Sequence, residues 1–144
     1  VFRHLRCTYV IAGMNPSRRL IEAAKPYPHI RVEANPDTER MEKLIHQAQI
    51  HILITFQNTG LKLKLLNSLF AGRHTIVNTL MLAGSGLDAL CHIADTPQEM
   101  IQACETLMKQ PIDQVSIDQR RNLLYPTFSN KEEGKRLYQM IYED

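Results

Sequence analysis

The sequence predicts an α/β fold, in which a parallel sheet of four or five strands has helices on both faces. Short apolar runs rich in β-branched residues alternate with segments whose apolar residues recur at helical spacing. The runs are apolar at successive positions, which is typical of strands buried on both faces of a sheet. A length of 144 residues, with no internal repeat and no interior linker, predicts one domain over residues 1–144.

Five segments are expected to be strands. They are "CTYVIAG" (7–13), "IRVEA" (30–34), "IHILITF" (50–56), "HTIVN" (74–78) and "CHIA" (91–94). The first ends in glycine, and the last carries the weakest strand pattern of the five. A short glycine-containing link, "LAGSGLDAL" (82–90), joins the last two.

Helical patterns fill the intervals between these strands. In "NPSRRLIEAAKPY" (15–27) apolar residues recur at helical spacing, and in "NPDTERMEKLIHQAQ" (35–49) either Asp37 or Thr38 can provide the N-cap. A third helix is expected over 60–72. Three more follow the last strand, at about 96–109, at about 114–124 and in "NKEEGKRLYQMIYE" (130–143).

Composition narrows the class of protein. The apolar fraction of 44% and the charged fraction of 22% are those of a globular domain. A formal net charge of +2 gives no reason to expect nucleic acid as a partner. No apolar run approaches the roughly 18 residues of a membrane span. The odd number of cysteines, without metal-ligand spacing, predicts reduced thiols, no metal site and a cytoplasmic location.

Candidate binding residues follow the predicted strands. In parallel sheets, ligands bind at the carboxyl ends of the strands, against helix N-termini. Those ends are Gly13 to Asn15, Asn35 to Asp37, Gln57 to Lys64 and Asn78 to Gly86, and all are rich in Gly, Asn or Thr. The same residue types are common in ordinary turns. "GSG" (84–86) could form a nest of backbone amides, or it could be only a turn.

The helix predicted over 60–72 begins with an unusual charge pattern. Lys62 and Lys64 lie in its first turn and no acid lies in "NTGLKLKLLNSLFAG" (58–72), although a helix N-terminus carries a partial positive charge. Gly60 allows close backbone approach, and the first-turn amides lack partners within the helix. These features predict a site for phosphate or diphosphate. An equal alternative is that both lysines are simply solvated.

The order of these motifs resembles the donor-binding half of a GT-B glycosyltransferase. It is most similar to the large retaining group that uses nucleotide-activated sugars, whose helix after a glycine-containing loop reads roughly "G-x-[RK]-x-K-x-L-E-A-M-A-x-G-x-P-V-V". The resemblance covers about residues 7 to 94. The matching positions are Gly60, Lys62, Lys64, Leu66, Gly72, Ile76 and Val77.

The resemblance implies a Rossmann-like three-layer domain that binds a nucleoside-diphosphate sugar without a metal or other cofactor. Lys62 and Lys64 would stabilise the departing diphosphate, as catalytic groups of a hexosyltransferase acting on a glycan or lipid-linked acceptor in polysaccharide biosynthesis. The donor-binding residues would be Gly13, Asn15, Asn35, Thr59, Gly60, Leu61, Asn67, Gly84, Ser85 and Gly86.

One departure from the family pattern affects donor binding. The family usually has two glutamates flanking this helix start, and Thr59 and Asn67 stand at those positions here. Asn67 could still hydrogen-bond a ribose hydroxyl, but as a neutral group. The resemblance therefore implies a divergent subgroup or weakened donor binding, and it does not identify the sugar.

The resemblance also implies a second partner, the N-terminal acceptor domain of a longer chain. The first strand and glycine-rich loop of the donor domain would lie upstream of Val1, and the fragment alone would be inactive. The parent enzyme could associate peripherally with a membrane. The helix over 130–143 would pack against the absent domain, so we expect it to pack loosely here or to find another chain.

Two other functions remain open. A Rossmann-like module could bind a nucleotide or sugar phosphate without transferring anything, and the replaced glutamates favour this slightly. A receiver-like signalling domain needs acids after the first strand, where "AGMNPS" (12–17) has none. No "GxGxxG" follows the first strand and no Ser/His/Asp order is present, which disfavours dehydrogenases and hydrolases.

Overall fold

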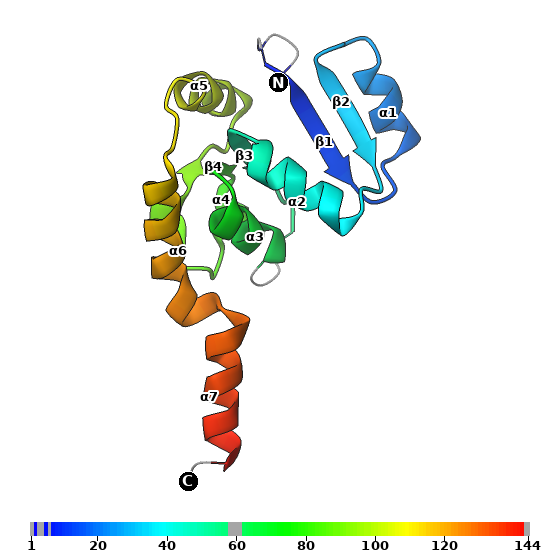
Figure 1. Ribbon diagram of the computed structural model, residues 1–144. Helices are drawn as coiled ribbons and strands as arrows, with labels where there is room; N and C mark the ends of the chain where they lie inside the picture. The colour runs from blue at the N-terminus through cyan, green and yellow to red at the C-terminus, as the bar shows by residue number, and fades with distance from the viewer. Residues whose placement is uncertain (1, 3–4, 6, 58–61, 143–144) are drawn as a thin grey trace.

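The protein is described by a computed structural model that covers residues 2, 5, 7–57 and 62–142. It is an α/β fold whose five strands alternate with helices (Figure 1). The strands are β1 (Tyr9–Gly13), β2 (Ile30–Ala34), β3 (Ile50–Leu53), β4 (His74–Val77) and β5 (His92–Ile93). Each lies within a segment predicted to be a strand.

The strands form two parallel sheets instead of one. β1 pairs with β2 in the register Tyr9↔Ile30, while β4 pairs with β3 in the register His74↔Ile50 and with β5 on its other side. The parallel direction was predicted and is confirmed. The prediction of a single sheet of four or five strands is wrong, because no ladder joins β1 to β3 within the described residues.

The helices begin where local capping rules place them. They are α1 (Arg18–Ala24), α2 (Thr38–Gln47), α3 (Leu63–Ala71), α4 (Thr79–Leu82), α5 (Pro97–Leu107), α6 (Gln114–Phe128) and α7 (Asn130–Tyr142), with a 3₁₀ turn η2 (Asp88–Leu90). Asp37, one of the two predicted candidates, caps α2 by accepting from the amide of Arg40 at 2.7 Å. Thr96 and Glu99 form a reciprocal capping box at α5. The short helix α4 was not predicted.

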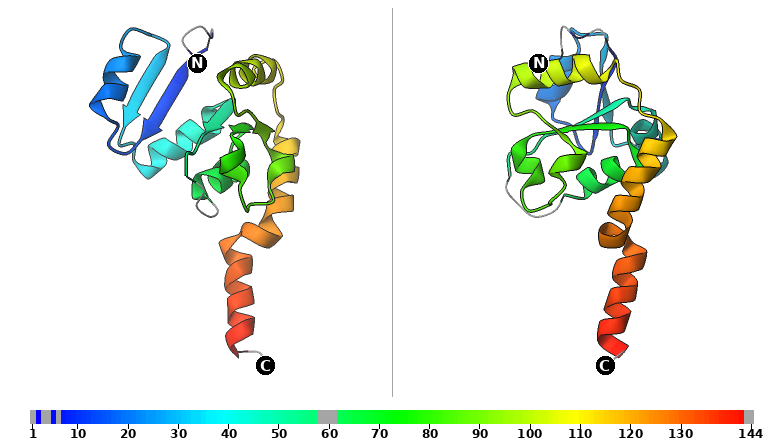
Figure 2. Two further views of the ribbon diagram at one scale, coloured as in Figure 1. Left: turned by 180° about the vertical axis from the view of Figure 1, so that it is seen from behind. Right: turned by 90° about the vertical axis from the view of Figure 1, so that its left-hand side faces the viewer.

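Helices cover both faces of the three-stranded sheet, as Figure 2 shows from two further directions. Successive residues of a strand point to opposite faces, and β4 illustrates this. Val77 packs in a core cluster with residues of α3, α4 and α6, whereas Ile76 packs in a second cluster with residues of α5. The layered arrangement of a Rossmann-like domain is therefore present around this sheet, at a smaller size than predicted.

The C-terminal helix α7 extends away from the rest of the molecule (Figure 1). It contributes no buried residue, and its apolar side chains, among them Leu137, Met140 and Ile141, are exposed. This agrees with the expectation of loose packing, which hydrogen exchange has yet to test.

Candidate functional site

Asn15 and Asn35 meet at the carboxyl end of the two-stranded sheet. Both residues adopt positive φ angles, of 46° and 52°, a conformation that asparagine tolerates better than most residues. The amide of Asn15 donates to Oδ1 of Asn35 at 2.7 Å, and the amide of Asn35 donates to the carbonyl of Gly13 at 2.9 Å. The structure thus brings together three residues predicted for donor binding.

The helix carrying the predicted lysines starts later than the sequence suggested. Its N-cap is Lys62, and its first helical residue is Leu63 instead of a residue near Gly60. The carbonyl of Lys62 accepts from the amides of Leu65 and Leu66, while N–H groups at the start of a helix lack partners within it. Three predicted contacts, Thr59, Gly60 and Leu61, lie outside the described residues.

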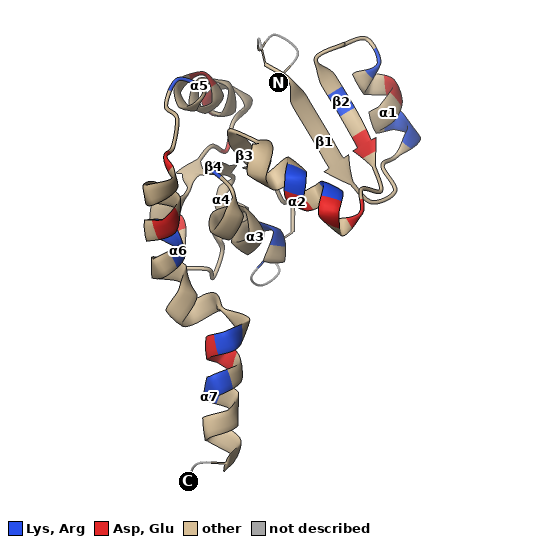
Figure 3. Ribbon diagram, viewed as in Figure 1, with Lys and Arg blue, Asp and Glu red and all other residues tan. Residues whose placement is uncertain are grey.

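The amine of Lys64 lies at the carboxyl end of β3. Its Nζ donates to the carbonyl of Ile54, just after that strand, at 3.2 Å. The side chain is exposed, and no salt bridge of the described residues includes it. Figure 3 shows the positive charge at the start of α3. Asn67, one turn further along α3, is also exposed. Lys64 therefore reaches the end of the sheet where the sequence predicted a ligand, and Asn67 is exposed on the same helix.

A row of polar side chains connects the ends of the three strands. Asn78 bridges β3 and β4, because its Oδ1 accepts from the amide of Thr55 at 3.1 Å and its Nδ2 donates to the carbonyl of Thr55 at 2.8 Å. Asp95 accepts from the amide and the hydroxyl of Thr79, at 2.8 and 2.7 Å. These hydrogen bonds from Thr79 lower the pKa of the Asp95 carboxyl.

Sequence reasoning missed the roles of Asn78 and Asp95. It placed Asn78 at a predicted strand end, but it named neither residue among those for donor binding. The available signal was the polar residue directly after each apolar run. Because their partners lie 23 and 16 residues away, the pairing itself depends on the fold.

The loop 84–86 is a turn with two left-handed glycines. Gly84 and Gly86 have φ of 71° and 66°, which most other residues avoid. The hydroxyl of Ser85 donates to the carbonyl of Leu82 and accepts from the amide of Leu87. No hydrogen bond joins this loop to Lys64 or Asn67 among the described residues. The side chain of Ser85 thus closes this turn through local hydrogen bonds.

Exposed apolar side chains lie next to strand ends of both sheets. Phe56 follows β3 and is 91% exposed, Leu63 opens α3 and is 75% exposed, and Met14 follows β1 and is 73% exposed. Isolated exposed apolar residues are normal on protein surfaces, but these three all follow or flank strand ends. Two of them are close in sequence to the contact of Lys64 with the carbonyl of Ile54, since Phe56 lies two residues after Ile54 and Leu63 directly precedes Lys64.

Buried polar contacts hold α3 in place. His51 of β3 is buried between Ser68 of α3, whose Oγ lies 3.0 Å from Nδ1, and the carbonyl of Ile45, 2.9 Å from Nε2. A carbonyl can only accept, so Nε2 carries the proton of the neutral ring and Nδ1 accepts from the serine. Burial lowers the pKa of His51, which favours this neutral form.

An arginine of α6 caps the opposite end of α3. The guanidinium of Arg120 donates to the carbonyls of Leu69 and Arg73, at 2.7 and 2.6 Å, and also to that of Gly72. A cation at a helix C-terminus satisfies free carbonyls and interacts favourably with the helix dipole. The position of α3 is thus fixed at its C-terminal end, while its N-terminal turn stays at the surface.

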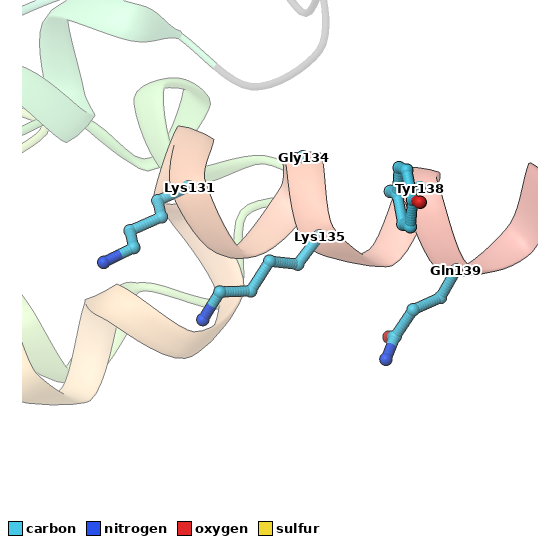
Figure 4. Close-up of a pocket in the computed structure, with 5 residues that line it drawn as sticks. All are labelled: Lys131, Gly134, Lys135, Tyr138 and Gln139. Carbon is cyan, nitrogen blue, oxygen red and sulfur yellow. The ribbon is translucent and has the colours of Figure 1, made fainter. Parts of the chain in front are cut away.

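Two hollows of the described surface lie away from these residues. One runs along a single face of α7 and is lined by Lys131, Gly134, Lys135, Tyr138 and Gln139 (Figure 4). The other lies between β5 and α5. Neither is lined by Lys62, Lys64 or Asn67. A hollow formed by one helix alone encloses little, so the strand ends remain the stronger candidate site.

No protein family, no characterised protein and no solved structure matches the chain. No helix in the described part is both long and apolar enough to cross a membrane. Nor do the described residues contain a group of three or more His, Cys, Asp or Glu side chains that could hold a metal ion.

Proposed function

We propose that this chain is the nucleotide-sugar-binding domain of a GT-B glycosyltransferase, with the donor diphosphate at the start of α3. The observation that carries the proposal is the position of Lys64, whose amine lies at the carboxyl end of β3 beside the first turn of α3. A diphosphate would bind there through the helix dipole and the first-turn amides together with the lysine. This position supports the match of "GLKLKLLNSLFAG" (60–72) to the donor-site helix of that family.

The surroundings of Lys64 suit a nucleotide diphosphate. The lysine donates to a neutral carbonyl, so a diphosphate oxygen would offer it a stronger, charge-assisted hydrogen bond. Asn67 would face the ribose, and the exposed ring of Phe56 would contact the base or the sugar. Asn78 would hold the strand end rigid under the ligand.

Catalysis would consist of stabilising the leaving group. As the bond between the sugar and the diphosphate breaks, negative charge grows on the diphosphate, and Lys62, Lys64 and the amides of the first turn of α3 would stabilise it. No protein residue has to change its protonation in this step. The acceptor and its activation would be the task of the N-terminal domain of the parent chain.

A second candidate is a module that binds a nucleotide or sugar phosphate without transfer. The observation favouring it is the neutral Asn67, exposed at the position where the resembled family carries a glutamate. Assay of the parent polypeptide for sugar transfer separates the two, because a module binds nucleotide without turnover.

Calorimetric titration tests the site. The wild-type chain, Lys64→Ala and the control Lys109→Ala would each be titrated with UDP, GDP, ADP and inorganic pyrophosphate. Lys109 is an exposed lysine just beyond the C-terminal end of α5. Loss of one charge-assisted hydrogen bond predicts that Lys64→Ala weakens diphosphate binding about tenfold or more. Lys109→Ala should bind as the wild type does, and equal affinity of all three proteins would contradict the proposed site.

A further inference from the structure

β5 is the outermost strand of the three-stranded sheet. It pairs with β4 on one side, and no strand of the described residues pairs with its other side. A free strand edge presents main-chain donors and acceptors that readily pair with another extended segment. Both residues of β5, His92 and Ile93, are exposed, so this edge is accessible.

The register of the ladder identifies the groups that this edge presents. β5 is parallel to β4, and Ile93 lies opposite Val77. The amide of Ala94 donates to the carbonyl of Val77 at 2.8 Å, so His92 and Ala94 direct their main-chain groups toward β4. Main-chain groups alternate between the two sides of a strand, so the N–H and the C=O of Ile93 point to the open side. The free edge therefore offers one donor and one acceptor at the same residue.

A hollow runs along this edge, between β5 and α5. Its volume of about 540 Å³ is within the range of ligand-binding clefts. Three consecutive residues, 91–93, line it on the strand side. Because consecutive side chains of a strand point to opposite faces, a hollow lined by all three follows the main-chain edge. The open main-chain groups of Ile93 and the hollow therefore belong to one surface.

The helix side of the hollow is a single stripe of α5. Its residues recur at helical spacing and are Glu99, Gln102, Ala103 and Thr106. Glu99 and Ala103 are about 6 Å apart along the helix axis, close to the roughly 6.6–6.8 Å between alternate side chains of an extended chain. One row of side chains on an extended segment would thus contact both residues.

The hollow is acidic. Glu99 lines it and is exposed, and no lysine or arginine among the described residues lines it. The amides of Thr96 and Asp95 donate to Oε2 of Glu99 at 2.9 and 2.8 Å, and these hydrogen bonds lower the pKa of its carboxyl. Glu99 therefore stays ionised at neutral pH and attracts a cation to its end of the hollow.

We propose that an extended segment of a partner protein binds here as an added strand beside β5, with a lysine or arginine next to Glu99 and an apolar residue two positions away against Ala103. Its main chain would pair with Ile93, while alternate side chains enter the hollow. A second copy of the chain is a poorer fit, because twofold pairing of two β5 edges would bring two acidic hollows together. Lys64 does not line this hollow, so the surface is separate from the proposed diphosphate site.

An NMR titration with two synthetic peptides tests this surface. The acetylated and amidated peptides Thr-Lys-Thr-Val-Thr and Thr-Val-Thr-Lys-Thr place the lysine before or after the apolar residue, and so cover both strand directions. Titration to about 10 mM detects Kd values in the millimolar range. We expect one of the two peptides to shift the amide signals of Ile93 and Gln102 most, and to leave those of Leu63 and Lys64 unchanged.

A charge variant of the protein tests the role of Glu99. Glu99→Gln removes the charge but keeps the capping box with Thr96, since glutamine also serves at this position. Loss of a solvent-accessible ion pair predicts that this variant binds the preferred peptide about threefold more weakly. Glu105→Gln is the matched control, because Glu105 is an exposed acid of α5 that does not line the hollow. It should bind the peptide as the wild type does.

A change in the peptide tests the main-chain pairing without altering the protein. N-methylation of its three central amides removes the donors of an added strand and should abolish the shift of Ile93. Three results would each overturn the proposal: no shift at Ile93 with either peptide, undiminished binding of the methylated peptide, or equal affinities of the wild type and Glu99→Gln. Ile93 signals that change with the concentration of the chain alone would overturn it as well, and would assign the edge to a second copy.

Discussion

β1 and β4 are both short apolar strands, but they differ greatly in burial. All four residues of β4, including His74 and Thr75, are buried, whereas no residue of β1 is more than partly buried. β4 has a paired strand on each side and helices on both faces, while β1 has one paired neighbour within the described residues. The sequence of a strand permits burial, but its neighbours determine how much of it occurs.

The contacts that hold the two regions also differ. Around the three-stranded sheet, His51 and Arg120 make buried or half-buried hydrogen bonds to main-chain carbonyls. Around the two-stranded sheet, Arg40 forms an ion pair with Glu33, and their side chains are 39% and 24% exposed. Solvent-accessible ion pairs contribute little to stability. We therefore expect the three-stranded region to be the more stable of the two.

Alanine substitutions in the two strands should show the largest difference in the free energy of unfolding. Ile76→Ala removes a fully buried side chain from β4 and should lower the free energy of unfolding by about 3–4 kcal/mol. Ile11→Ala removes the same atoms from the partly buried β1 and should cost only about 1 kcal/mol. Urea unfolding of both variants measures the difference. Equal losses would mean that β1 is as well packed as β4.

Removal of the Arg120 guanidinium from the C-terminal end of α3 should cause the next largest loss in the free energy of unfolding. Arg120→Met keeps most of the aliphatic stem but leaves the carbonyls of Leu69, Gly72 and Arg73 without their donor. The expected loss is about 2 kcal/mol. Arg121→Met is the control, since that exposed neighbour donates to the carbonyl of Phe70 and forms an exposed ion pair with Asp118, and its loss should cost no more than about 0.5 kcal/mol. Matching losses in the two variants would refute the capping role of Arg120.

Acid should weaken the three-stranded region through His51. Burial lowers the pKa of His51 in the folded chain below its ordinary value of 6.5, so the unfolded chain binds its proton more readily. The stabilisation that neutral His51 contributes is fully present above pH 6.5. It is lost as the pH falls from 6.5 toward the lower pKa that His51 has in the folded chain. Urea unfolding from neutral to mildly acidic pH should show a steeper loss for wild type than for His51→Asn. Parallel curves would show that His51 does not titrate in this way.

Without ligand, Lys64→Ala should change the stability of the folded chain the least. Removing a positive charge from a helix N-terminus relieves an unfavourable interaction with the dipole, worth about 0.3–1 kcal/mol. The hydrogen bond to Ile54 offsets part of this gain. The melting temperature should therefore stay equal or rise slightly. A clear fall would mean that Lys64 has a structural role.

Local features of the fold were predictable from the sequence, and non-local ones were not. Asp37 and the pair Thr96–Glu99 cap helices through contacts three residues apart, which sequence spacing reveals directly. The division into two sheets depends on which strands have neighbours, and apolar runs in β1 and β4 look alike in the sequence. The helix predicted over 60–72 begins at Leu63, with Lys62 as its N-cap.

The candidate site was predictable to a similar extent. The carboxyl ends of parallel strands meet at one edge, which placed Lys64, Asn15 and Asn35 correctly at strand ends. The partner of Arg120 lies about 50 residues away, so no local pattern identifies it. The exposure of Phe56 could not be read from an apolar run that continues the strand pattern of β3.

An NMR titration of the wild-type chain with inorganic pyrophosphate tests the central claim most directly, because it locates an anion without assuming a base or a sugar. The account predicts that the largest amide shifts occur at Leu63 and Lys64, at the first turn of α3, and that Lys64→Ala removes them. Shifts confined to Lys131 and Lys135 on α7, or no shift at Leu63 and Lys64 at saturating pyrophosphate, would contradict it.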